Sequence, residues 1–249
     1  MPYFNIVAET SENTVVTEYE PVKKRSDSYQ SEAALEQEFI RMLCEQGYEY
    51  LPIHTESDLV SNLRRQLEEL NHYTFSDTEW EDFFHNAIAN PNEHIVEKTR
   101  KIQEDHIQNL RRDDGSTKNI TLIDKKNIHN NRLQVINQYV VSTKDGAKHD
   151  NRYDVTVLVN GFPLVHIELK RRGVAIREAF NQIERYQRES FWSGSGLYEY
   201  IQIFVISNGA NTKYYSNSTR WNAEREHKKK GASKTKSSNS FEFTCFWAD

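Results

Sequence analysis

An aspartate and a Glu-x-Lys triplet stand close together in the segment RYDVTVLVNGFPLVHIELKRR, residues 152–172. Asp154 lies in the first of two apolar-patterned runs, and Glu168 and Lys170 lie in the second. Two carboxylates can hold Mg²⁺, a hard cation that binds through one or two carboxylates together with water and phosphate oxygens. Such a metal polarises a phosphodiester, and a neighbouring ammonium group stabilises the charge that develops on phosphorus. These residue types therefore predict a site for metal-assisted phosphodiester hydrolysis.

The two runs alternate apolar and polar residues with the period of β-strands, so the two charged members of the triplet share one face. Whether Asp154 joins them depends on the connection, because hairpin register follows loop length. A two-residue turn at 160–161 pairs Asp154 with Ile167. A three-residue connection over 160–162, or an equivalent bulge, puts Asp154 opposite Glu168. We predict this second register.

Each of these pieces has an ordinary explanation when it stands alone. An aspartate can cap a strand or meet solvent, and Glu-Leu-Lys can be an exposed alternating pair on a sheet edge, since short motifs often match by chance. The combination is less ordinary, because the three charged residues interrupt strands whose other residues are mostly of buried types. Charge on such a face needs a partner or a function.

A helix is predicted after the second strand, in the segment GVAIREAFNQIERYQRES, residues 173–190. Its expected apolar side contains Ala175, Ala179, Phe180 and Ile183. Because positions i and i+4 share a helix face, Gln182 and Tyr186 lie together, with Arg185 beside them at the border of the apolar side. There these side chains can contact a phosphate or support Lys170 by hydrogen bonds. An ordinary solvated helix face is the alternative.

The pattern Asp154…Glu168-x-Lys170 resembles the motif of the PD-(D/E)xK nuclease superfamily, and Gln-Ile-Glu-Arg-Tyr at 182–186 is similar to the Gln-x-x-x-Tyr motif of its RecB-like and type I restriction branches. The resemblance continues through SYQSEAALEQEFI, LIDKKN, FVISNG and FEFTCFWAD. Over most of its length the chain resembles the N-terminal nuclease region of the restriction (R, motor) subunit of type I restriction enzymes. Tyr153 departs from the motif, which has proline there, but that proline only shapes the start of the strand.

The resemblance assigns roles to single residues. It implies metal ligands at Asp154, Glu168 and the backbone carbonyl of Leu169, and a catalytic lysine at Lys170. It also implies that both residues of the Gln-x-x-x-Tyr motif lie beside the site. The cations Arg171, Arg172 and Arg185 are candidates for contacts with the DNA backbone, although exposed cations are usually only solvated.

A further ligand is expected from a helix over residues 31–46, in the segment SEAALEQEFIRMLCEQGY, in which Ser31 is a natural N-cap. In the resembled fold the first core helix often carries a glutamate that reaches the metal, which makes Glu32 or Glu36 the candidate. The sequence does not choose between them. Acidic residues in a first turn are also favoured by the helix dipole alone.

The fold implied is an α/β protein with a restriction-endonuclease-like core, a central mixed β-sheet flanked by helices, plus a helical insertion. The implied activity is that of a type I site-specific deoxyribonuclease, whose Mg²⁺-dependent nuclease domain cuts double-stranded DNA without sequence readout of its own. The implied partners are the methylation (M) and specificity (S) subunits. No Gly-x-x-x-x-Gly-Lys-Ser/Thr loop is present, so ATP is expected only in absent motor domains. The alternatives are a non-catalytic docking or assembly module, and another superfamily nuclease from repair or a mobile element.

Composition agrees with a cytoplasmic enzyme domain. The chain has 249 residues, of which 37% are hydrophobic, enough to bury a core. It lacks a signal-peptide pattern in its first thirty residues and any run long enough to span a membrane, so no membrane partner is expected. Its two widely separated cysteines, Cys44 and Cys245, do not indicate a disulfide framework or a zinc site. A net charge of −5 disfavours indiscriminate nucleic-acid binding unless other domains grip the DNA.

We expect a single nuclease domain over 1–249, with its core at roughly 31–55 and 118–220. Further strands are expected at 48–53, 120–126, 133–141 and 200–209. Helices are expected at 61–71, 76–91 and 94–110, within a helical insertion at 56–117. The stretch 222–240 is polar and highly charged and is expected to be a flexible linker. A strand at 241–247 is expected to lead into an absent motor region.

Overall fold

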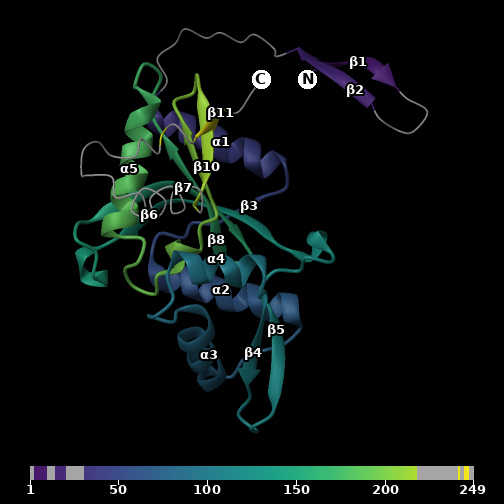
Figure 1. Cartoon of the computed structure of the whole chain (residues 1–249), viewed down its shortest axis with the longest axis vertical. Coiled ribbons are helices and arrows are strands. Elements are labelled where there is room, and N and C mark those ends of the chain that lie inside the picture. The colour runs from purple at the N-terminus through teal and green to yellow at the C-terminus, as the bar shows by residue number, and fades with distance from the viewer. Residues whose placement is uncertain (1–2, 10–14, 21–30, 218–240, 242–243, 247–249) are drawn as a thin grey trace, which may run out of the picture.

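The centre of the molecule is a seven-stranded mixed β-sheet with the order β11-β10-β9-β8-β7-β6-β3 (Figure 1). The structure is a computed structural model that describes residues 3–9, 15–20, 31–217, 241 and 244–246. The strands of this sheet are β3 (Glu49–Tyr50), β6 (Leu133–Val141), β7 (Asn151–Val159), β8 (Phe162–Leu169), β9 (Ile203–Ser207), β10 (Thr212–Ser216) and β11 (Cys245–Phe246). β3 runs parallel to β6 and β8 runs parallel to β9, and the other neighbours are antiparallel.

Helices cover both faces of this sheet. α1 (Glu32–Glu45) begins at the predicted cap Ser31, whose hydroxyl accepts a hydrogen bond from the backbone N–H of Ala34 at 3.2 Å, and its apolar stripe packs on alternate residues of β7 and β8. α5 (Ile176–Glu189) packs on the opposite face and carries the chain from β8 to the parallel strand β9 (Figure 1). The predicted α/β class, a mixed sheet flanked by helices, is confirmed.

Three helices and a hairpin lie between β3 and β6 in the chain, at the lower end of the molecule in Figure 1. They are α2 (Glu56–Asn71), α3 (Asp77–Phe83) with the π-helical turn η1 (Phe84–Ile88), α4 (Ile95–Gln103), β4 (Ile107–Arg111) and β5 (Thr117–Thr121). The prediction of helix as far as residue 110 is wrong, because the end of that segment is β4. The strand expected at 120–126 begins earlier, as β5, and pairs with β4 outside the central sheet.

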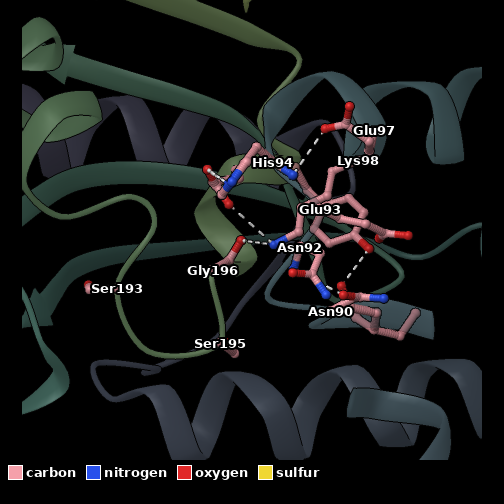
Figure 2. Close-up of polar contacts among 12 residues, drawn as sticks. Asn90, Asn92, Glu93, His94, Glu97, Lys98, Ser193, Ser195 and Gly196 are labelled. Atoms are coloured by element: carbon pink, nitrogen blue, oxygen red, sulfur yellow. Dashed lines mark hydrogen bonds and ion pairs between the residues drawn. The ribbon is translucent and has the colours of Figure 1, made fainter. Parts of the chain in front are cut away.

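Two charged side chains fix this part of the chain to the segment that follows α5. Lys98 on α4 is almost fully buried, and its Nζ donates to the carbonyl of Gly196 at 2.8 Å (Figure 2). The same Nζ lies 3.4 Å from the carboxylate of Glu199. Glu56 of α2 accepts a hydrogen bond from the backbone N–H of Ser195. Both helices therefore hold the loop that leads into η4 (Leu197–Tyr200).

The remaining elements are short. β1 (Tyr3–Glu9) and β2 (Val15–Glu20) pair antiparallel in a sheet of their own, and 3₁₀ turns form η2 (Ile128–Asn130) and η3 (Thr143–Asp145). The strand expected at 48–53 is reduced to the two residues of β3. The strand expected at 241–247 is represented by β11, and the predicted linker at 222–240 lies outside the described residues. None of the helices in the described part of the chain combines the length and the apolar character that crossing a bilayer requires.

Candidate active site

The hairpin of β7 and β8 determines whether the predicted carboxylates meet. Its two-residue turn at 160–161 has positive φ at both positions, +50° and +82°, as in the tight turns that match the twist of a hairpin. The register then shifts by one residue within the hairpin, and beyond this bulge Val155 pairs with Ile167. Asp154 therefore lies opposite Glu168. The predicted register is confirmed, and a bulge produces it.

Gly161 is required in this turn for two reasons. Its φ of +82° is unfavourable for residues with a side chain. A Cβ atom at this position would also lie 2.6 Å from the Cα atom of Leu63 in α2. The turn of the hairpin is thus in direct contact with the backbone of α2.

Asp154, Glu168 and Lys170 form one polar cluster at the C-terminal end of β8. The backbone N–H of Leu169 donates to Oδ2 of Asp154 at 2.9 Å, and Nζ of Lys170 donates to Oε1 of Glu168 at 3.0 Å. The Glu168 side chain has no exposed surface, whereas 13% of the Lys170 side chain is exposed. A buried carboxylate therefore lies between a second carboxylate and a cation that reaches solvent.

Both carboxyl groups of this cluster hold their protons more tightly than usual. Burial, and then repulsion from Glu168, raises the pKa of Asp154 from 3.8 to about 7. Burial raises the pKa of Glu168 from 4.5 to about 7, although Lys170 opposes this effect. Desolvation disfavours the charged form of an acid, and a like charge nearby adds to that effect. When both carboxyl groups are ionised, their negative charge is therefore not fully balanced by the positive charge of Lys170.

A divalent cation would balance the negative charge of the two carboxylates. Oε2 of Glu168 is buried and has no hydrogen-bond partner among the described residues, and a carboxylate oxygen in that state is a ready donor for a hard metal ion. Across the described ranges, no three His, Cys, Asp or Glu side chains gather as a metal site. A cation here would depend on Asp154, Glu168 and oxygen atoms from water, backbone or substrate, which is the usual Mg²⁺ arrangement.

The two candidate glutamates of α1 act on different members of the pair. Glu32 is exposed and accepts a hydrogen bond from the backbone N–H of Arg171 at 3.2 Å, and its charge adds to burial in raising the pKa of Glu168. Glu36 is buried, and burial followed by lesser repulsion from Asp154 raises its pKa. Each glutamate therefore lies within the electrostatic range of one carboxylate of the cluster.

The Gln-x-x-x-Tyr pair on α5 lies beside the cluster but does not hydrogen-bond to Lys170 within the described residues. Gln182 donates to the hydroxyl of Tyr186, and that hydroxyl donates to the carbonyl of Arg152 at 2.9 Å. Tyr186 is 1% exposed, so its predicted position at the border of the helix is wrong. Its contact holds β7 two residues before Asp154.

The basic candidates lie around the edge of the cluster. Arg171 and Arg172 follow Lys170 directly and are exposed. Arg185 is exposed on α5, and its guanidinium lies 5.4 Å from the ring centroid of Tyr186. All three cations are therefore exposed, two of them next to Lys170 in the chain and the third beside the ring of Tyr186.

Two features of the site carried no usable signal in the sequence. His166 is fully buried among aromatic rings, and its Nε2 lies 3.5 Å from Oε2 of Glu168; burial lowers its pKa to about 4, so it is neutral. Asn137 and Gln138 of β6 donate their side-chain amides to the carboxylate of Glu36, a contact between segments about a hundred residues apart.

The sequence of this chain is similar to those of known proteins. The family model described as "Type I restriction enzyme R protein N terminus" matches residues 29–223. The type I restriction enzyme EcoprrI endonuclease subunit of Escherichia coli is 46% identical over 243 residues, which is 97% of this chain and 72% of that protein. The SauMSSORF170P endonuclease subunit of Staphylococcus aureus (strain MSSA476) is 40% identical over 195 residues, 76% of this chain and 20% of that protein. The chain thus spans about a fifth of its staphylococcal relative.

Proposed function

The chain belongs to the family of type I restriction enzyme R protein N termini, and we propose that it is the Mg²⁺-dependent DNA endonuclease domain of such a subunit. Its relatives are named as endonuclease subunits of type I restriction enzymes, which supports a nuclease-related role. The cleavage chemistry and the metal are proposals that rest on the site itself.

One observation carries the proposal. The buried Glu168 lies opposite Asp154, has one carboxylate oxygen without a hydrogen-bond partner among the described residues, and pairs through the other oxygen with Lys170. Buried charge without compensation is unfavourable, and it is retained where a ligand supplies the missing charge. A cation between the two carboxylates would provide that compensation.

In this proposal the carboxylates bind the metal, and Lys170 stabilises the charge of the reacting phosphate. Asp154 and Glu168 would hold Mg²⁺ after losing their protons, and the carbonyl of Leu169 is a further expected ligand. When bound, the metal would polarise the phosphodiester and lower the pKa of the attacking water. Lys170 would stay protonated, orient the water or the phosphate, and stabilise the negative charge that develops on the phosphorus oxygens. Tyr186 would keep β7 in place, and Glu32 or Glu36 would add a further acidic group.

The remaining assignments concern the complex rather than the site. Double-stranded DNA is the proposed substrate, with contacts from Arg171, Arg172 and Arg185, and the M and S subunits are the proposed partners in the cytoplasm. ATP would act only in motor domains of the parent subunit. Sequence recognition belongs to other subunits in this proposal, because the site offers groups for phosphate rather than for base edges.

Metal binding and plasmid cleavage test the proposal together. We would measure Mn²⁺ and Mg²⁺ binding by calorimetry and nicking of supercoiled plasmid for wild type, Asp154→Asn and Lys170→Met, with Glu81→Gln as a control at an exposed acid of α3. We expect Asp154→Asn to lose metal binding and cleavage. Lys170→Met should keep metal binding and lose about 10²–10³-fold in cleavage rate. The Glu81→Gln variant should match wild type.

The outcomes separate the parts of the proposal. Binding that depends on Asp154 without cleavage by any protein would support the metal centre and assign activity to the assembled enzyme. A wild-type chain that binds neither metal would contradict the proposed function. In that case the domain would be better described as a docking module.

A further inference from the structure

Gln138 has an unusual backbone conformation for a residue inside a strand. Its φ is +52°, in the left-handed region that residues with a long side chain rarely occupy. The pairing of β6 with β7 runs from Leu133 to Val141, and its register places Gln138 opposite Asp154. The irregular residue of β6 is therefore the direct neighbour of a proposed metal ligand.

The normal alternation of side chains breaks at this position in both strands. Thr156 is paired with Ile136 and hydrogen-bonds to the hydroxyl of Tyr198 at 3.2 Å. The ring of Tyr198 also contacts Tyr139 and Tyr153, at centroid distances of 4.9 and 4.6 Å. Residues three apart in each strand thus face the same side, whereas a regular strand would put them on opposite sides. The left-handed residue makes this change of face possible beside Asp154.

The side chain of Gln138 forms a hydrogen bond beside the same irregular position of β6. Its amide nitrogen donates to one oxygen of Glu36, and the amide nitrogen of Asn137 donates to the other. Tyr50 donates to Oδ1 of Asn137 at 2.9 Å, which fixes the orientation of that amide. Glu36 is 7% exposed, so its carboxylate is fixed in one position by two neutral donors.

We propose that Gln138 is a positioning residue of the nuclease site, which holds the Glu36 carboxylate beside Asp154 so that it completes the acidic surroundings of the metal. This inference rests on the proposed function, and it adds a residue that acts through Glu36 without touching the metal or the DNA. Backbone strain of this kind is concentrated at functional sites, where the surrounding structure enforces it. Groups that orient metal-binding side chains commonly contribute to metal affinity.

The choice of residue supports this role. Glycine, and to a lesser degree asparagine, occupies the left-handed region more easily than glutamine does. Asparagine carries the same amide on a side chain that is one methylene shorter. If only the backbone shape of β6 mattered, either residue would serve as well at position 138. The presence of glutamine therefore indicates that a side chain long enough to contact Glu36 is required at this position.

A double-mutant cycle between Gln138 and Glu36 tests the proposal in the full chain. We would measure Mn²⁺ affinity by calorimetry for wild type, Gln138→Gly, Glu36→Gln and the double variant. We expect each single variant to bind Mn²⁺ about 10-fold more weakly. The double variant should bind no more weakly than Glu36→Gln, because residues that act through one another are not additive. Gln138→Asn should behave like Gln138→Gly.

Folding is controlled in the same experiment. Relief of the left-handed strain offsets the lost hydrogen bond, so the melting temperature of Gln138→Gly should stay within about 4 °C of wild type. His72, at the exposed C-cap of α2 with φ +47°, provides the matched control. His72→Gly relieves a comparable backbone conformation and should leave Mn²⁺ affinity unchanged.

Each contrary outcome has a defined meaning. Wild-type affinity in Gln138→Gly or Gln138→Asn, or additive losses in the double variant, would overturn the role of Gln138 and leave the proposed function intact. A loss of affinity in His72→Gly of the same size would show that backbone changes act indirectly, and would also overturn it. If wild type binds no Mn²⁺, the proposed function fails and this inference fails with it.

Discussion

Removing the charge of Asp154 should make the metal-free chain more stable at alkaline pH. In the folded chain the pKa of Asp154 is raised from 3.8 to about 7 by burial and by repulsion from Glu168. Between these two values the folded state keeps a proton that the unfolded state has lost. Its stability therefore falls as the pH rises through this window, and the loss is complete above the folded pKa. Asp154→Asn keeps the shape of the side chain but removes this titration.

The size of the effect follows from the pKa. From pH 5.5 to the folded pKa of Asp154 at about 7 the pH rises by about 1.5 units. Each of these units lowers the unfolding free energy by about 1.4 kcal/mol. Wild type should therefore lose about 2 kcal/mol of unfolding free energy relative to Asp154→Asn. Glu168, with a pKa of about 7, adds to the loss, while His166, with a pKa of about 4, has the opposite sign. Both are present in the two proteins and largely cancel in the difference.

Urea unfolding followed by circular dichroism measures this difference. Wild type and Asp154→Asn would be compared at pH 5.5 and pH 8 in the presence of a chelator, with Glu81→Gln as the control for loss of an exposed acid. The expected result is a shift of the unfolding midpoint in favour of the variant at pH 8, with unchanged slope. A difference between the two proteins that is the same at both pH values would refute the assignment of a raised pKa to Asp154.

Three other results are expected. Mg²⁺ should raise the melting temperature of wild type more at pH 8 than at pH 6, because protons compete with the metal at the site. Scanning calorimetry of both proteins measures this, and Asp154→Asn should show no rise at either pH. Lys98→Ala should lower the unfolding free energy by about 3 kcal/mol, since it breaks a buried ion pair, while Arg100→Ala, in an exposed pair of the same helix, should cost below about 1 kcal/mol in the same urea assay. Gly161→Ala should destabilise the chain more than Gly115→Ala, although both have φ near +80°, because a Cβ meets backbone at 2.6 Å only at the first position; equal losses would contradict the close approach to α2.

The position of the carboxylate pair was predictable because its determinants are local. The alternation of β7 and β8, the turn residues at 160–161 and the strand length are all written in one segment of about twenty residues. The sequence left two registers open, and the requirement that Asp154 meet Glu168 selected the correct one. Of the two means predicted for this register, a three-residue connection or an equivalent bulge, the hairpin uses the bulge. The cap of α1, the helix α5 and the strand β9 were predictable on the same local grounds.

The features that were missed depend on contacts between distant segments. The segment 107–111 continues a helical pattern, but it pairs with β5 across a turn that contains Asp114 and Gly115. That Asp-Gly pair is a hairpin signal, and it outweighed local periodicity. Tyr186 satisfies the i, i+4 pattern on a helix face, yet its hydroxyl reaches the backbone of β7 and becomes buried. Nothing in the sequence marks Gln138 as left-handed, because glutamine is not a residue that favours that conformation.

Two unfavourable features of the molecule meet at one point of the sheet. On β7 and β8 the buried carboxyls of Asp154 and Glu168 have raised pKa values, and Glu168 has an oxygen without a hydrogen-bond partner among the described residues. On the neighbouring strand, directly opposite Asp154, Gln138 has a strained backbone. Stability alone would favour an amide at 154 and a glycine at 138. Both destabilising features lie on adjacent residues, as expected if this part of the sheet binds a cation. A ligand that binds only the folded state stabilises it, and this offsets the destabilising features of the binding site.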